Sequence, residues 1–165
     1  MGGWGGIGRD GGHRCGSRLH FYHRRGLRVS GFPTQRIPTA AYTALRIAAG
    51  LTFTVHGAQK MLGWFGGFGA EGATVEYLSR FGIAGGVELI GGLLITLGLF
   101  TRFAALIASG EMAVAYFWMH VGGSGKLFWW ENRGEAVMLY AFLWLLVATA
   151  GAGPISLDAA LRKKG

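Results

Sequence analysis

The segment AALIASGEMAVAYFWMH, from Ala104 to His120, decides the fold class of this chain. Its only acidic residue, Glu111, lies near the middle, and nearly all its neighbours are small or apolar. A helix on the surface of a soluble protein would carry a wide polar stripe, which this segment lacks. About 20 apolar residues suffice to cross a bilayer as a helix. The segment is therefore typical of a membrane helix in which Glu111 needs a partner or a function.

Three further apolar runs of similar length follow Pro38, each of about 18–23 residues. The whole chain of 165 residues is 51% hydrophobic and 15% charged, whereas soluble domains are about 25% charged. Aromatic residues gather near several ends of the runs, as in the interfacial belts of membrane proteins. The sequence predicts an all-α, four-transmembrane-helix bundle with a two-residue hinge at 101–102. The four runs cover approximately residues 39–61, 83–100, 103–121 and 135–153.

The positive charge of the chain is concentrated in residues 1–38. This segment has seven arginines and a single acidic residue, Asp10, and so carries +6 of the net +8. The remaining +2 leaves no basic groove for a nucleic acid, which excludes that class of partner. The segment is rich in glycine without apolar periodicity and is predicted to be disordered. Two interpretations stay open: a native tail, and translation from an upstream start.

The predicted organisation has three parts: the tail 1–38, a transmembrane domain 39–158 and a basic C-terminal tail 159–165. Lysine and arginine counts near helix ends set membrane orientation. The first segment, the short hinge with Arg102 and the last residues carry an excess of basic residues. In the two longer loops, glutamates offset the few lysines and arginines. We therefore expect both termini in the cytoplasm and these loops outside.

Each predicted helix carries ionisable residues, which are costly in lipid and normally face a bundle interior. The alternating helix directions and a rise of about 1.5 Å per residue place five of them in the outer half of the bundle. Arg46 stands apart, roughly 15 Å further inward than His56, and is interpreted as structural. The predicted polar cluster consists of His56, Lys60, Glu88, Glu111 and Glu135.

Two interpretations of this polar cluster stay open. The groups could simply pair and hold the helices in register, since His56 and Lys60 lie four residues apart on one helix face. Alternatively, the surplus of acids leaves one glutamate protonated or matched by a ligand, as proton-coupled chemistry requires. His56 and Glu111 are then the candidate proton-transfer pair. No metal site is predicted, because the Glu-x-x-His pairs of di-iron bundles are absent.

The residues also resemble a known family. LRIAAGLTFTVHGAQKMLGWFGGFG (45–69) is similar to the first helix of the DoxX family, with an early arginine and His-Gly-x-x-Lys before a glycine-rich turn. The resemblance continues through GGVELIGGLLITLGLFTRFAALIASGEMAVAYFWMH (85–120) and NRGEAVMLYAFLWLLVATAGAGPISLD (132–158). It implies a small four-helix integral membrane protein of prokaryotic type, which we expect in the cytoplasmic (inner) membrane. The family takes its name from a subunit associated with archaeal thiosulfate:quinone oxidoreductase, but membership alone does not settle function.

Three functions follow as hypotheses. The first is a membrane redox subunit that binds a quinone as its cofactor through the polar cluster. Its electrons would come from a soluble or membrane partner, because a single cysteine, Cys15, cannot form a redox pair. The second is a non-catalytic scaffold or assembly subunit that recruits soluble partners. The third is a small proton-coupled transporter, for which four helices are few unless the chain forms a homo-oligomer. In each, the lipid bilayer is the common partner.

Overall fold

A computed structural model describes Gly2 and residues 39–163 of the chain. All secondary structure in this described part is helical, which confirms the all-α class. The predictions about the N-terminal segment, including its disorder and Cys15, concern residues outside the described part. The helices are α1 Thr39–Leu62, α2 Arg80–Leu97, α3 Thr101–Ala115, the π-helix η1 Tyr116–Val121, α4 Gly122–Ser124, α5 Trp129–Asn132, α6 Glu135–Ala150 and α7 Leu157–Arg162.

Two helical stretches in the described part are long and apolar enough to cross a membrane: α2 and the continuous stretch Thr101–Ser124, which joins α3, η1 and α4. The other two long helices differ from them. The 24 residues of α1 carry too many polar side chains to meet the same standard. The 16 residues of α6 are apolar but extend only about 24 Å, against about 30 Å for a bilayer core. The count of four transmembrane helices therefore stays a prediction.

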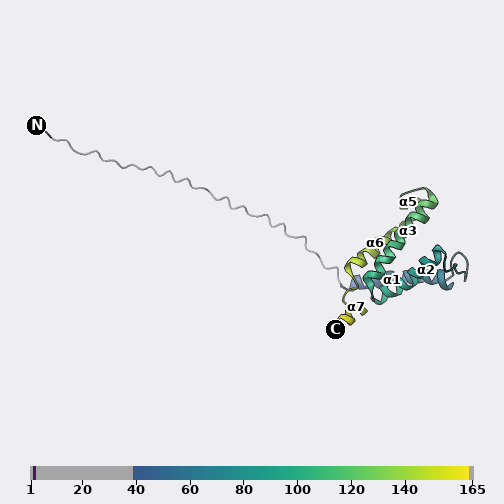
Figure 1. The fold of residues 1–165 in the computed structure, drawn as a ribbon, viewed down its shortest axis with the longest axis horizontal. Coiled ribbons are helices and arrows are strands. Elements are labelled where there is room, and N and C mark those ends of the chain that lie inside the picture. The colour runs from purple at the N-terminus through teal and green to yellow at the C-terminus, as the bar shows by residue number, and fades with distance from the viewer. Residues whose placement is uncertain (1, 3–38, 164–165) are drawn as a thin grey trace. The chain divides into compact units, whose positions relative to one another are not determined.

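The long helices are arranged as two pairs. Figure 1 shows α1 beside α2 and α3 beside α6, with the two pairs diverging from the end of the bundle that holds α7. Glycine permits the close approach of α1 to α2. A Cβ at Gly57 would lie within 2.6 Å of the Cα of Leu89, and a Cβ at Gly92 would lie 2.6 Å from the backbone nitrogen of Thr54. The pair is thus held together by direct backbone proximity.

Aromatic residues join the two pairs in the middle of the bundle. Phe53 of α1 is almost completely buried, and its ring centroid lies 5.2 Å from that of Trp144 and 5.8 Å from that of Tyr140. Both partners belong to α6. Edge-to-face and tilted aromatic contacts of this kind add to the energy of burial. They fix the position of the α3–α6 pair against α1.

The hinge between α2 and α3 lies earlier than predicted. Gly98 and Phe100 adopt left-handed backbone conformations, with φ of 72° and 46°. Thr101, which the prediction placed in the hinge, is already the first residue of α3. The reason is tertiary: both carboxylate oxygens of Asp158 accept hydrogen bonds from the first backbone amides, Phe100 N at 2.9 Å and Thr101 N at 3.1 Å. The distant carboxylate caps α3 and so moves its start toward the N-terminus.

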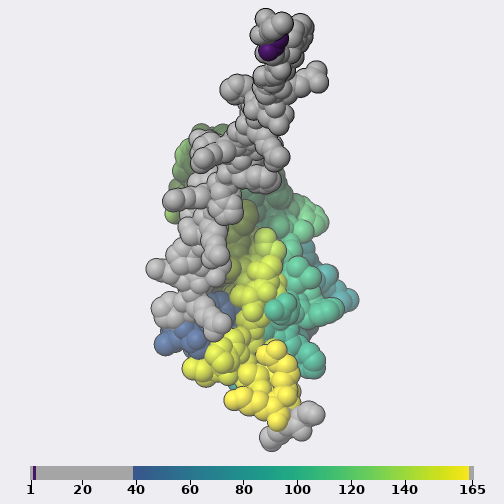
Figure 2. Space-filling model, turned by 90° about the vertical axis from the view of Figure 1, so that its left-hand side faces the viewer, coloured from purple at the N-terminus to yellow at the C-terminus, as the bar shows by residue number. Residues whose placement is uncertain are grey.

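The C-terminal residues 157–162 form a helix that packs on this hinge. The backbone nitrogen of Asp158 donates to Gly98 O at 2.8 Å, reciprocating the contacts of its carboxylate. Figure 2 shows the yellow residues of α7 close to the teal residues at the junction of α2 and α3. The predicted boundary between the transmembrane domain and a basic tail, at 158–159, therefore falls inside α7.

Candidate functional site

The centre of the candidate site is an ion pair between α1 and α2. Nζ of Lys60 lies 2.5 Å from Oε1 and 2.6 Å from Oε2 of Glu88. The Glu88 side chain is only 4% exposed and that of Lys60 is 16% exposed. Gly85 makes room for this contact. A Cβ added at Gly85 would lie only 2.9 Å from the Cβ of Lys60, so a larger residue there would collide with the lysine side chain. The Lys60 side chain therefore passes over Gly85 and reaches the carboxylate of Glu88, about one turn further along α2.

Glu111 faces this ion pair from α3. It lies within electrostatic range of both Glu88 and Lys60. Its Oε2 is buried and has no hydrogen-bond partner in the described part of the protein. A buried carboxyl oxygen without a partner is unfavourable unless another group or a ligand supplies one. The structure thus joins two of the five residues of the polar cluster in an ion pair, with Glu111 within electrostatic range of both. One Glu111 oxygen is left without a partner in the described part.

The other two residues of the polar cluster lie apart from this core. The predicted pairing of His56 with Glu111 is not present: His56 is exposed, and its Nδ1 lies 3.3 Å from Oε1 of Gln59. The physical reason is that Gly57, not His56, occupies the line of closest contact with α2. His56 nevertheless remains within electrostatic range of Glu88.

Glu135 is exposed at the first turn of α6. It lines a separate hollow of about 490 Å³ together with Trp129, Trp130 and Arg133. Within residues 39–163, no ion pair joins Glu135 to Lys60. Because α6 packs mainly on α3, its N-terminal residue is not directed to the α1–α2 contact.

Arg46 lies at the opposite end of α1 and is 99% buried, with 1% of its surface exposed. Its guanidinium donates to the carbonyl oxygens of Ile95, of Thr96 at 2.8 Å and of Ile155 at 2.9 Å. Two of these, Ile95 O and Thr96 O, are among the last carbonyls of α2, where helical hydrogen bonds run out, and Ile95 O also accepts from Gly98 N at 3.2 Å. Arg46 therefore caps α2 and attaches the segment before α7 to it.

The sequence analysis did not identify two organising residues. The first is Asn132, which is buried and ties together the loop 125–134: its Nδ2 donates to Lys126 O at 3.0 Å, and its Oδ1 accepts from Gly134 N at 2.8 Å. Tyr116, in the π-helix, donates to Leu127 O of the same loop at 2.5 Å. A local signal existed, since Asn-Arg-Gly before an apolar run is typical of a turn.

The second is Asp158. Partial burial raises the pKa of its carboxyl, but the backbone hydrogen bonds from Thr101 and Phe100 and the charge of Arg162 outweigh burial, so the pKa lies below its ordinary value. Asp158 consequently remains ionised while it caps α3. Its position two residues after Ser156, itself the N-cap of α7, indicates a helix start but not the distant helix that the carboxylate caps.

The described part thus defines an all-helical protein with an ion pair between two of its helices and two helical stretches long and apolar enough to cross a membrane. A model of the DoxX family matches residues 41–121. A protein of Haemophilus influenzae, described as an uncharacterized protein, is 43% identical over 125 residues, which cover 73% of this chain and 90% of the relative. A second uncharacterized protein of that organism is 32% identical over 81 residues, 49% of this chain and 52% of the relative.

The chain therefore belongs to the DoxX family. No solved structure matches it. Family membership agrees with association with a membrane, in line with the two apolar helices long enough to span one.

Proposed function

We propose that this chain is a membrane redox subunit that binds a quinone beside Glu111. The observation that carries the proposal is the buried Oε2 of Glu111, which has no hydrogen-bond partner in the described part while it faces the Lys60–Glu88 ion pair. An unpartnered, ionised carboxylate is costly among membrane helices. A proton on Glu111 removes that cost and provides a hydrogen-bond donor for a quinone carbonyl.

The ion pair sets the electrostatics of this site. The opposite charges of Lys60 and Glu88 cancel, so the pair has no net charge. A quinone beside it is exposed to the dipole of the pair. When a quinone is reduced it takes up protons as well as electrons, and Glu111 is the group placed to supply the first proton. His56, exposed on α1, then connects this region with the outer surface, as histidine can exchange protons near neutral pH. The electrons come from a partner protein.

Quinone titration tests this proposal. The purified protein contains six tryptophans, whose fluorescence reports binding of a short-chain ubiquinone. We expect saturable quenching in the parent and at least about tenfold weaker binding in Glu111→Leu, equivalent to about 1.4 kcal/mol. Glu111→Gln keeps a donor but cannot release a proton. Binding should weaken with rising pH in the parent, as Glu111 ionises, and this pH dependence should be absent in Glu111→Gln.

The matched control is Glu131→Leu, the same chemical change at an exposed position in α5. It should bind quinone like the parent. All variants are compared only if their unfolding temperatures agree to within a few degrees. Linear, unsaturable quenching in the parent, or equal loss of binding in Glu131→Leu, contradicts the proposal.

A non-catalytic scaffold is the second candidate. The observation in its favour is that the Lys60–Glu88 ion pair and the terminal nitrogens of Arg46 join helices. If Glu111→Leu lowers the unfolding temperature strongly and the parent binds no quinone, the polar cluster has a structural role. Co-purification of a stoichiometric soluble partner that survives Glu111→Gln would then support the scaffold.

A further inference from the structure

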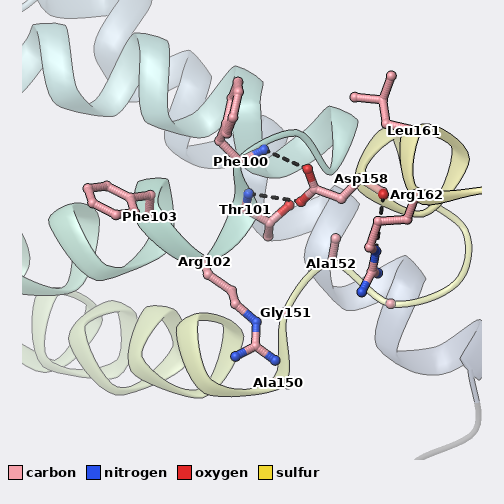
Figure 3. Close-up of a pocket in the computed structure, with 11 residues that line it drawn as sticks. Phe100, Thr101, Arg102, Phe103, Ala150, Gly151, Ala152, Asp158, Leu161 and Arg162 are labelled. Carbon is pink, nitrogen blue, oxygen red and sulfur yellow. Dashed lines mark hydrogen bonds between the residues drawn. The ribbon is translucent and has the colours of Figure 1, made fainter. Parts of the chain in front are cut away.

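A second hollow lies at the other end of the bundle, far along the helices from the polar cluster. It has a volume of about 500 Å³ and is formed by the start of α3, the end of α6 and α7. Figure 3 shows its lining residues, among them Arg102 extending toward Gly151 and Asp158 turned toward the amides of Phe100 and Thr101. The proposed quinone site does not use this pocket.

Two arginines give the pocket a positive character. Arg102 lies directly against Gly151, where a Cβ would be 3.0 Å from its Nε, so glycine leaves the room that the guanidinium occupies. Arg162 donates through Nε to Asp158 O at 3.3 Å, which orients its terminal nitrogens. Among residues 39–163, no carboxylate lies within ion-pair distance of either guanidinium. The carboxylate that lines the pocket, Asp158, already accepts two backbone hydrogen bonds.

The rim of the pocket is apolar. Phe103 is 74% exposed, and Phe100 and Leu161 are also largely exposed. One turn further along α3, Leu106 and Ile107 are more than half exposed as well. Paired arginines bind phosphate through charge-assisted hydrogen bonds. A free phosphate would use the arginines alone, whereas the apolar rim requires a ligand with hydrocarbon chains attached.

We propose that this pocket binds the phosphate headgroup of an anionic phospholipid between Arg102 and Arg162, with an acyl chain along Phe103 and the exposed face of α3. The site places a lipid against the junction of α2, α3 and α7. The lipid would lie in the leaflet that the basic end of the protein faces, which is also where basic residues favour anionic lipids.

Lipid retention by the purified full chain tests this proposal. Native mass spectrometry counts bound lipid in mixed micelles that contain either phosphatidylglycerol or phosphatidylcholine. The parent should retain one phosphatidylglycerol in preference to phosphatidylcholine. Arg102→Gln/Arg162→Gln should bind phosphatidylglycerol at least about tenfold more weakly, because two charge-assisted contacts are lost. The control Lys126→Gln/Arg133→Gln removes the same charge from the loop 125–134 and should bind it as the parent does.

A second variant keeps the test decisive if the double arginine variant does not fold. Phe103→Ser leaves both arginines in place and should weaken phosphatidylglycerol binding without changing the effect of inorganic phosphate on the unfolding temperature. Equal retention of the two lipids by the parent overturns the proposal, as does equal loss in the control. Inorganic phosphate that binds as tightly as the lipid would also overturn it, because the pocket would then be a site for the free anion.

Discussion

Individual polar side chains in this protein differ in how completely they are satisfied. Lys60 and Glu88 neutralise each other at 2.5–2.6 Å, and Arg46 donates to three carbonyls. Glu111, by contrast, has a buried oxygen without a partner in the described part. Satisfied groups stabilise the helix contacts that contain them, whereas an unsatisfied group costs free energy until a proton or ligand meets it. An unsatisfied atom alone does not assign a function, because the buried Nε of Arg46 also lacks a partner in the described part. Glu111 differs in lying within electrostatic range of the Lys60–Glu88 ion pair.

The ion pair should be strongly coupled. Lys60→Met leaves the buried Glu88 carboxylate unpaired and should lower the free energy of unfolding by about 3 kcal/mol or more. Lys60→Met/Glu88→Leu removes both charges and should recover most of that loss, because a buried pair can be replaced by apolar side chains at little cost. The measurement is denaturant unfolding of the purified protein in detergent.

An exposed ion pair serves as the control. Lys126 and Glu131 lie 3.7 Å apart in the loop 125–134 with about half of each side chain exposed. Lys126→Met should change the unfolding free energy by less than about 1 kcal/mol. If the double variant at 60 and 88 is as unstable as the single one, the pair contributes through packing of its hydrocarbon parts and not through charge.

At the level of elements, the contact of α1 with α2 depends on glycines whose faces meet backbone. Gly57 lies against Leu89, and Gly50 and Gly92 lie against each other's helices. Because lipid provides no hydrophobic force between helices, close packing and the contacts that it permits stabilise the pair. The same closeness lets Lys60 reach Glu88, so the distance between α1 and α2 determines whether the ion pair of the candidate site can form.

Two alanine substitutions in these helices should differ in sign. Gly57→Ala would place a methyl group against the Leu89 backbone, and we expect a loss of about 1–3 kcal/mol from overpacking. Gly86→Ala in α2 adds its methyl where no atom lies within 4 Å. It should be neutral or stabilise by up to about 1 kcal/mol, the difference in helix propensity between the two residues.

Thermal unfolding of the two variants in the same detergent measures this difference. Gly57→Ala should also weaken the Lys60–Glu88 contact, since separating the helices lengthens it. Equal effects of the two substitutions would mean that α1 and α2 do not pack as closely as their glycines indicate.

At the scale of the whole molecule, the described part has two chemically different ends. One holds the glycine- and aromatic-rich loops and the polar cluster, and the other holds Arg46, Arg102 and the basic α7. Basic residues concentrate on the cytoplasmic side of membrane proteins. This asymmetry predicts that the loop 125–134, which contains Lys126, faces away from the cytoplasm and that α7 faces it.

Cysteine labelling tests the orientation. In a Cys15→Ser background, which removes the only native cysteine, Lys126→Cys should react with a membrane-impermeant maleimide in intact cells. Lys163→Cys should react only after the cells are permeabilised. Labelling of both positions in intact cells, or the reverse pattern, would contradict the predicted orientation.

Much of the helical architecture could be predicted because it depends on local composition. Long apolar runs form helices wherever they pack, so the predicted run 135–153 corresponds closely to α6 at Glu135–Ala150. The π-helix from Tyr116 to Val121 could not be predicted, since Leu127, whose carbonyl accepts a hydrogen bond from Tyr116, comes later in the chain. The hinge was misplaced for the same reason: Asp158, 57 residues after Thr101, sets the start of α3.

The sequence by itself determined the helical class, the family and which ionisable residues the apolar runs carry, because composition and periodicity are local properties. Only the tertiary structure decided which of those residues meet. Lys60 pairs with Glu88 rather than His56 with Glu111, since a glycine contact between backbones selects which side chains share the space between α1 and α2. Sequence spacing determines which residues share a face of one helix. Which of those residues make a contact depends on where a second helix packs against that face.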